Sequence, residues 1–277
     1  MILDTNTLVG IMVLAYGAAF LSSIMDLTLK RKSLEKVGLA LLIVAFAFNT
    51  WAVAGRWVEA GRPPFKTMYE TLIFYPWCVV TVTFVLVAMH RLFFLIPFAA
   101  GAALIGLIYA LFRPDMEILN LPPALQSAWF VPHVVTYFVA YAALFASFAL
   151  ALTALVYPRW NKRRGHARNS NDDSLAKLEL YAHQAAVFGI VTLTLGLVLG
   201  AAWGKMAWGE YWSWDPKENW ALVCWLAYML YLHLRLISGW REQKAMWVLV
   251  MAFAAVIFTY LGINLLPTAG GSLHSYQ

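Results

Sequence analysis

The chain has 277 residues, of which 62% are apolar and only 12% carry a charge. Soluble domains carry about 25% charged residues, so this composition excludes an ordinary water-soluble globular protein. The net charge of +6 could suggest a nucleic-acid-binding protein, but the basic residues stand at the ends of apolar runs, and no nucleic-acid partner is expected.

Eight apolar segments follow one another along the chain. Each approaches the length of about 20 residues that crosses a bilayer as a helix. In chain order they cover 8–27, 37–57, 69–89, 92–111, 133–157, 185–203, 220–238 and 245–266. The sequence therefore predicts an all-α, polytopic integral membrane protein with about eight transmembrane helices, forming a single membrane domain over residues 1–277.

Lysine and arginine are concentrated in alternate connections between these segments. The connections after the first, third, fifth and seventh segments hold 14 of the 20 basic residues. Such an excess marks the cytoplasmic side, so both termini are expected outside. The first segment has its charges after the apolar run, which favours a retained span over a cleaved signal peptide. The basic and polar connection 158–182 is expected to be a solvated loop.

The two cysteines, Cys78 and Cys224, both lie inside apolar segments and do not form a Cys-x-x-Cys pair. This placement is typical of buried membrane cysteines. It excludes a thioredoxin-type redox site, an iron–sulfur site and a cysteine-based zinc site.

An outer loop at 203–220 is unusually rich in tryptophan: Trp203, Trp208, Trp212, Trp214 and Trp220. An interfacial aromatic belt accounts for the first and last of these, which stand at helix ends. The three in the middle are better explained by a shelf of rigid ring faces for a planar apolar ligand.

The same loop contains charged residues with two possible roles each. Asp215 precedes Pro216 and stands three residues before Glu218, which predicts a capping box at the next helix, with direct ligand contact as the alternative. Lys205 and Lys217 are the only cations of the loop. They would either meet acidic groups of a ligand or pair with Glu210 and Glu218.

Topology separates the six histidines into groups. His133 opens the fifth segment and His274 lies in the outer tail, so both are expected level with the tryptophans, where two imidazoles could bind the metal of a planar macrocycle from its two faces. The alternative is two unremarkable loop histidines.

His233 stands 13 residues after Trp220, about 20 Å along a helix. It is either a functional intramembrane group or a neutral imidazole bonded to a neighbouring helix. Arg235 is expected to snorkel to the inner surface. The remaining histidines, His90, His166 and His183, are expected to be solvated or interfacial.

These motifs resemble the WWD-loop cytochrome c assembly family of haem-handling proteins, in its CcsA/ResC (system II) branch. The resemblance runs from about residue 63 to the end of the chain. It rests on the tryptophan loop through Trp214-Asp215, on Tyr69-Glu70-Thr-Leu, on 123–129 with His133 following, on Tyr231-Leu-His233-Leu-Arg235, and on 262–266 leading to Leu273-His274-Ser-Tyr276.

The resemblance implies that His133 and His274 ligate haem iron at the outer face and that His233 belongs to a haem site within the membrane. Trp203, Trp208, Trp212, Trp214 and Asp215 would complete the cofactor-binding set around haem b. The chain would be a subunit of a cytochrome c synthase (haem lyase) complex.

The resemblance also implies partners and a location. A CcsB/ResB-type membrane protein, apocytochrome c and thiol-reducing membrane or periplasmic proteins would act with the chain. It would lie in a bacterial plasma membrane or a thylakoid membrane, with its active face outside the cytoplasm. Haem would be presented there for thioether attachment to Cys-x-x-Cys-His motifs, mainly by positioning of thiol against vinyl group. No catalytic nucleophile is expected.

Three other functions remain open on the residues alone. A haem exporter without ligation chemistry would need the same residues. A b-type electron carrier would need paired deep histidines, whereas only His233 is predicted deep in the membrane. A structural subunit would not depend on His133 and His274 at all.

Overall fold

The computed structural model describes residues 5–29, 32–113, 115–118, 120–163 and 173–262. This part of the chain contains helices and no strand. Its α-helices are α1 (Thr5–Leu29), α2 (Lys32–Ala60), α3 (Met68–His90), α4 (Ile96–Leu111), α5 (Phe130–Arg163), α6 (Asp173–Trp208), α7 (Pro216–Leu236) and α8 (Glu242–Tyr260). Two short 3-10 helices lie at Phe93–Leu95 and Pro123–Leu125.

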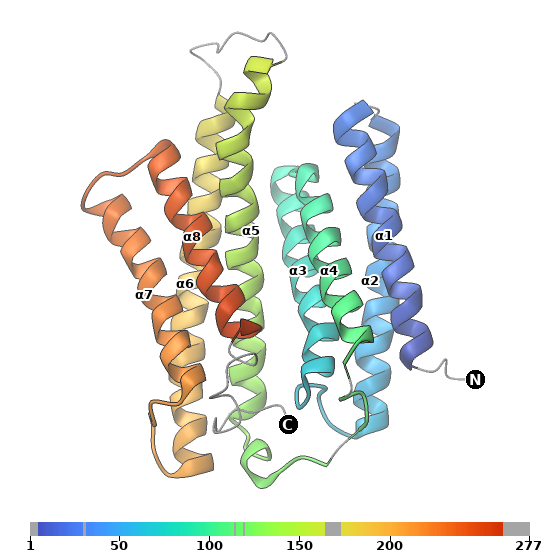
Figure 1. Cartoon of the computed structure of the whole chain (residues 1–277), viewed down its shortest axis with the longest axis vertical. Helices are drawn as coiled ribbons and strands as arrows, with labels where there is room; N and C mark the ends of the chain where they lie inside the picture. Colours follow the sequence, from blue (N-terminus) through green and yellow to red (C-terminus); the bar gives the residue numbers. More distant parts are fainter. Residues whose placement is uncertain (1–4, 30–31, 114, 119, 164–172, 263–277) are drawn as a thin grey trace. The chain divides into compact units, whose positions relative to one another are not determined.

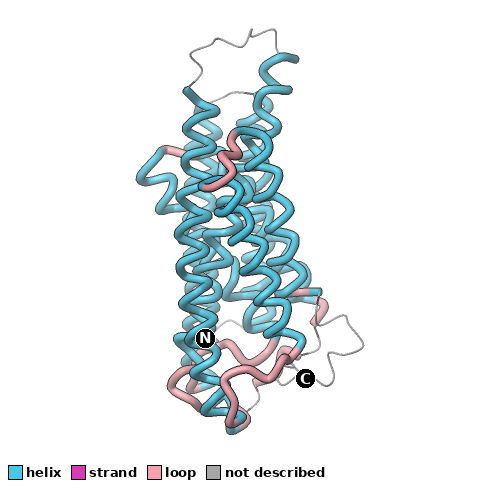
Figure 2. Tube along the Cα trace, turned by 90° about the vertical axis from the view of Figure 1, so that its left-hand side faces the viewer, coloured by secondary structure: helices cyan, strands magenta, loops and turns pink. Residues whose placement is uncertain are grey.

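The helices form two compact units. The first unit ends at Gln126 and contains α1 to α4; the second begins at Ser127 and contains α5 to α8. Within the first, α1 and α3 each pack against both α2 and α4. Within the second, α5 packs against α6 and α8, and α7 packs against the same two helices. Each unit is therefore a four-helix bundle (Figures 1 and 2), and the single membrane domain predicted for the whole chain stays a prediction.

A buried polar contact joins three helices of the first unit near a proline. Pro76 lies inside α3, where its ring lacks an N–H and disturbs the carbonyls one turn earlier. The Asn49 amide of α2 donates to the Ile73 carbonyl at 3.0 Å and accepts from the Tyr16 hydroxyl of α1 at 3.1 Å. Asn49 thus satisfies a backbone carbonyl near this proline, where no water is available.

Small residues bring α5 and α6 close together in the second unit. A Cβ placed on Gly189 of α6 would lie 2.5 Å from Leu144 Cδ2 of α5, so only hydrogen fits there. Ser147 of α5 donates to the Ala182 carbonyl of α6 at 2.8 Å. Small residues are what permits such close approach between membrane helices.

The inner connection between α5 and α6 differs from its prediction. The segment 158–182 was expected to be a loop, but α5 continues to Arg163 and α6 already begins at Asp173. A helix can extend into water without an apolar face when its residues are good helix formers. Asp173 in the first turn of α6 also stabilises this helix through its interaction with the helix dipole.

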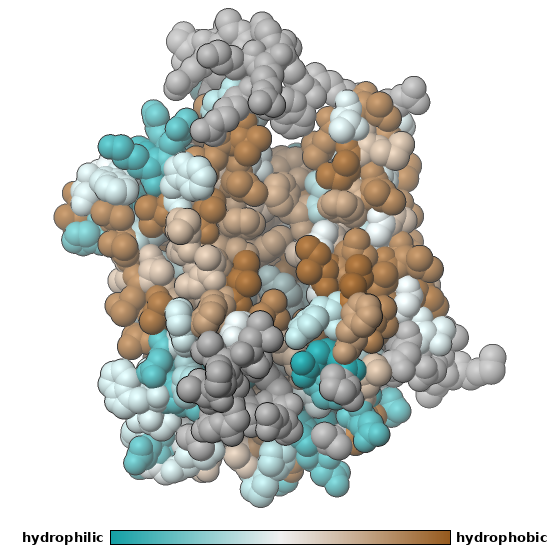
Figure 3. Space-filling model, viewed as in Figure 1, coloured by the Kyte–Doolittle hydropathy of each residue, from teal (hydrophilic) through white to brown (hydrophobic). Residues whose placement is uncertain are grey.

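The prediction of an all-helical, polytopic membrane protein is confirmed. Seven spans of the described residues are long and apolar enough to cross a membrane: α1, α2, α3, α4 together with the preceding 3-10 helix, α5, α6 and α8. α7 is apolar only from 220 to 232, which is shorter than the ~20 residues of a full span. Exposed apolar side chains lie on all eight α-helices and colour the middle of the visible face brown in Figure 3. Such a surface is stable in lipid and not in water.

Candidate functional site

His133 lies near the start of α5 and contacts the backbone of α6. Its Nδ1 is 3.0 Å from the carbonyl oxygen of Gly196. A carbonyl oxygen only accepts hydrogen bonds, so Nδ1 must carry the proton and the lone pair of the neutral ring is on Nε2. Nε2 is therefore the nitrogen with which this ring would bind a metal.

Two of the predicted tryptophans pack next to this histidine, Trp203 directly and Trp208 through Trp203. The Trp203 ring centroid lies 5.4 Å from that of His133 and 5.3 Å from that of Phe130. Trp208 stands edge-on to Trp203 at 4.7 Å. Trp203 is only 2% exposed, so it forms a buried base beneath the histidine and contributes no open face.

The tryptophan loop is shorter than predicted because helices enter it from both sides. α6 runs through Trp208 and α7 begins at Pro216, which leaves residues 209–215 between them. Trp212 and Trp214 lie edge to face, with centroids 6.0 Å apart and planes at 85°. Four of the five loop tryptophans thus form two edge-to-face pairs, Trp220 packs against Phe258, and the shelf for a planar ligand stays a prediction.

Two details of this loop point to a functional surface. Trp214 has φ +59°, a left-handed backbone that is unusual for a bulky residue, and its side chain is 68% exposed. Trp212 Nε1 is buried without a hydrogen-bond partner among the described residues. A buried indole donor without an acceptor is costly, which makes Trp212 an unusual feature of this loop.

The capping box predicted at the start of α7 is present. Lys217 N donates to the Asp215 carboxylate at 3.0 Å, and the Glu218 carboxylate accepts from Asp215 N at 3.2 Å. Glu218 also accepts from Ser213 N at 2.8 Å. Asp215 therefore has the structural role expected for it, while its contact with a ligand stays a prediction.

The two lysines of the loop have different surroundings. Lys205 Nζ donates to the Gly209 carbonyl at 2.7 Å and lies 5.5 Å from the centre of the Tyr211 ring. Both roles predicted for Lys205, contact with acidic groups of a ligand and pairing with a loop glutamate, stay predictions. Lys217 is half-buried, and burial lowers the pKa of its amine to about 7, against the opposite effect of the Asp215 carboxylate.

His233 is not in contact with this group of aromatic residues. It lies on an exposed face of α7, and its distance of about 20 Å from Trp220 follows from the helical rise. Val223, Leu226 and Leu230 are exposed on the same face, at alternating intervals of three and four residues that continue to His233. His274, the third predicted ligand, lies outside the described residues.

The end of this unit that is predicted to face the cytoplasm contains polar contacts that the sequence analysis missed. Arg235 was expected to snorkel, but it is 6% exposed and pairs with Glu179 of α6 at 2.6 Å. His183 Nδ1 is 3.1 Å from the Tyr231 hydroxyl, so His183 also bridges α6 and α7. Because each pair joins two helices, no local sequence pattern could have indicated either contact.

A second missed cluster lies in the first unit, around Glu70. Its carboxylate is fully buried and accepts from Arg62 at 2.9 and 3.1 Å and from Arg56 at 3.4 Å. Arg56 also donates to the Met116 carbonyl at 2.6 Å. The acidic Glu70 within an apolar segment was the one sequence signal for this cluster. Its partners could not be read from the motif, because Arg56 lies in α2 and Arg62 lies between α2 and α3.

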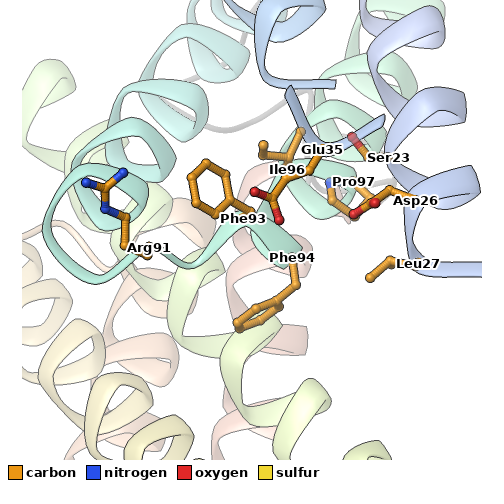
Figure 4. A pocket seen from close by; sticks show the side chains of 9 residues that line it. All are labelled: Ser23, Asp26, Leu27, Glu35, Arg91, Phe93, Phe94, Ile96 and Pro97. Carbon is orange, nitrogen blue, oxygen red and sulfur yellow. The ribbon is translucent and has the colours of Figure 1, made fainter. Parts of the chain in front are cut away.

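A hollow of about 230 Å³ lies in the first unit, between the end of α1, the start of α2 and the turn from α3 to α4. In the view of Figure 4, Arg91 and Asp26 stand at its two ends, with Phe93 and Glu35 between them. It is smaller than the ~300–1,000 Å³ of typical ligand sites and contains none of the predicted site residues. Within the described ranges, no three metal-ligating side chains converge.

Comparison with known proteins gives consistent results. Residues 65–269 match the family model described as cytochrome C assembly protein. The cytochrome c biogenesis protein CcsA of Parasynechococcus marenigrum is 36% identical over 272 residues, covering 88% of each chain. CcsA of Chlamydomonas reinhardtii is 35% identical over 230 residues, covering 80% of this chain and 63% of its own.

A solved structure shares the fold. The cytochrome c heme lyase CcmF superposes with a TM-score of 0.71 at 16% identity, covering 92% of this chain and 46% of CcmF. At this identity the likeness concerns the arrangement of helices only.

Proposed function

This chain belongs to the family of cytochrome c assembly proteins, and from that premise we propose that it holds haem at its outer face and presents it for covalent attachment to apocytochrome c. His133 and His274 bind the iron from opposite faces of the macrocycle. The tryptophans and Asp215 form the surrounding loop. A CcsB/ResB-type membrane protein completes the complex.

The observation that supports this proposal best is the environment of His133. Its Nδ1 hydrogen is held by the Gly196 carbonyl at 3.0 Å, so Nε2 is the nitrogen that would ligate a metal. Histidine ligands usually have their second nitrogen bonded in this way, because the bond fixes the ring and raises its basicity. Haem is an amphiphile whose exposure to water is unfavourable, and the partly exposed Trp208, packed on the buried Trp203, supplies apolar surface near His133.

The polar groups of the loop suit the acidic edge of haem. The buried Trp212 N–H has no acceptor among the described residues, and a haem carboxylate would supply one. Lys205 lies nearby in sequence and is exposed, so its ammonium group remains accessible to an anion. These groups would orient the ring so that its vinyl groups point toward the arriving cytochrome.

The exposed position of His233 supports a partner within the membrane. An imidazole facing lipid is unfavourable, whereas one facing another protein chain binds a shared haem or forms a hydrogen bond. We assign His233 to a second haem position, completed by the CcsB/ResB-type partner.

The attachment itself requires little chemistry from this chain. The S–H bond of an apocytochrome cysteine adds across a haem vinyl group, forming one C–S and one C–H bond with no leaving group. Histidines and tryptophans that hold the vinyl group against the thiol would supply most of the rate enhancement, as positioned reactants do in general.

The test is a visible absorption spectrum of the purified full chain, with and without co-expressed partner, for the parent protein and the His133→Ala, His274→Ala and His233→Ala variants. His90→Ala, in the first unit, is the matched control. We expect a reduced low-spin haem spectrum that is lost or shifted in His133→Ala and His274→Ala and unchanged in His90→Ala.

Two results would count against the proposal. A haem spectrum that persists unchanged in both His133→Ala and His274→Ala would contradict haem binding at the outer face. Absence of haem under every condition would remove haem binding by this chain. Thioether formation on a co-expressed apocytochrome separates presentation for attachment from export alone.

A further inference from the structure

Two glycines of α6 lie directly beneath the aromatic side chains at the start of α5. A Cβ built on Gly200 would lie 2.6 Å from Cε1 and 2.8 Å from Nδ1 of His133. A Cβ built on Gly196 would lie 2.6 Å from Cδ2 of Tyr137. Ordinary carbon contacts lie at about 3.5–4.0 Å, so neither position has room for a side chain.

This closeness determines which atom His133 meets. Gly200 leaves room for the imidazole and Gly196 leaves room for the neighbouring Tyr137 ring. The imidazole can therefore reach the α6 backbone and bond the Gly196 carbonyl at 3.0 Å. Tyr137 lies against the ring at 4.8 Å and Trp203 lies at 5.4 Å on centroids. The half-buried ring therefore packs against two aromatic neighbours, Tyr137 and Trp203.

We propose that Gly196 and Gly200 are positioning residues for His133. They admit the ring to the one carbonyl that holds its proton on Nδ1, and so present Nε2 as the ligand nitrogen. The identity of the ligand as haem rests on the proposed function. The tautomer of His133 and its dependence on the two glycines are independent of the proposed function.

The same helix provides a matched control. Gly189 is equally crowded, since a Cβ there would lie 2.5 Å from Leu144 Cδ2, but its neighbour on α5 is an aliphatic side chain. Gly189→Ala therefore disturbs α5–α6 packing without touching His133. If the other two glycines have a specific role, Gly200→Ala must change the tautomer of His133 and Gly189→Ala must leave it unchanged.

The experiment uses the full chain, free of haem, labelled with ¹⁵N-histidine and reconstituted in lipid. Solid-state NMR distinguishes the two neutral imidazole tautomers, and His133→Gln assigns the signal. We expect the Nδ1–H form in the parent protein and in Gly189→Ala, and its loss in Gly200→Ala. An unchanged His133 signal in Gly200→Ala would overturn the proposal.

Haem titration of the same samples gives a second readout. Loss of a group that orients a metal ligand typically lowers affinity by about 10–100-fold, and we expect this for Gly200→Ala relative to Gly189→Ala. A tautomer change in a protein that never binds haem would support the positioning role and refute the proposed ligand. Equal haem affinity of the two variants would refute the positioning role.

A third variant keeps the proposal testable where Gly200→Ala does not fold. The double variant Gly200→Ala/His133→Ala removes the ring that the new methyl group would strike. It should fold as well as His133→Ala alone. Failure of the double variant would show that Gly200 serves α5–α6 packing in general, and would overturn the proposal.

Discussion

Lys217 stands in the first turn of α7, half-buried beside the capping carboxylate of Asp215. Burial lowers the pKa of its amine from the ordinary value of 10.5 to about 7. Between these two values the unfolded chain binds more protons than the folded one, so the free energy of unfolding rises with pH through that window. Below pH 7 both states are protonated and this contribution no longer changes.

A neutral amine is also a nucleophile, which makes the pKa measurable. We predict that amine-selective acylation of Lys217, followed by mass spectrometry, shows a midpoint near pH 7. The more exposed Lys205 is labelled in the same sample and serves as the internal reference. A midpoint for Lys217 close to 10 would show that its amine is solvated.

Glu70 acts at the scale of whole elements, because its carboxylate joins three parts of the first unit. Arg56 comes from α2, Arg62 from the connection to α3, and Thr67 with Glu70 forms the capping box of α3. Removing one partner of a buried ion pair leaves charge without compensation and costs about 3–5 kcal/mol. We predict a loss of this order for Glu70→Gln, measured by denaturant unfolding in detergent.

The reactivity of the two native cysteines shows which part of the chain is destabilised in Glu70→Gln. Cys78 is buried in α3 and Cys224 is buried in α7. Glu70→Gln should expose Cys78 to a thiol reagent before Cys224. Glu59→Gln, which changes an exposed glutamate, should leave both protected and stay within about 0.5 kcal/mol of the parent. Equal behaviour of the two variants would contradict a structural role for Glu70.

For the whole molecule, the distribution of lysine and arginine predicts the orientation in the membrane. Lys36 lies near the start of α2 on the side predicted to be cytoplasmic, and Tyr211 lies in the tryptophan loop on the opposite side. Both residues are exposed, and the two native cysteines are buried and should stay silent. We predict that an impermeant thiol reagent labels Tyr211→Cys in intact cells or spheroplasts and labels Lys36→Cys only after permeabilisation. The reverse pattern would invert the topology.

Local features of the sequence were sufficient for much of this description. Apolar segments identified the eight α-helices, although that of α7 is shorter than a full span. The Asp215-Pro216 pair with Glu218 three residues later identified the capping box. Both depend on residues that are close in the chain. The predicted bounds of α5, α6 and α7 were less accurate. Hydropathy identifies the part of a helix that is stable in lipid, whereas the helix itself ends where its backbone hydrogen bonds end.

Only the tertiary structure decided which distant residues meet. Arg235 and Glu179 are 56 positions apart, and His133 lies 63 positions from the carbonyl that orients it. Such contacts depend on which faces of two helices turn toward each other and on how closely the backbones approach. The sequence by itself determined that this is a helical membrane protein with a tryptophan-rich loop. The packing of α5 on the glycines of α6 decided which nitrogen of His133 is presented, because only hydrogen fits between them.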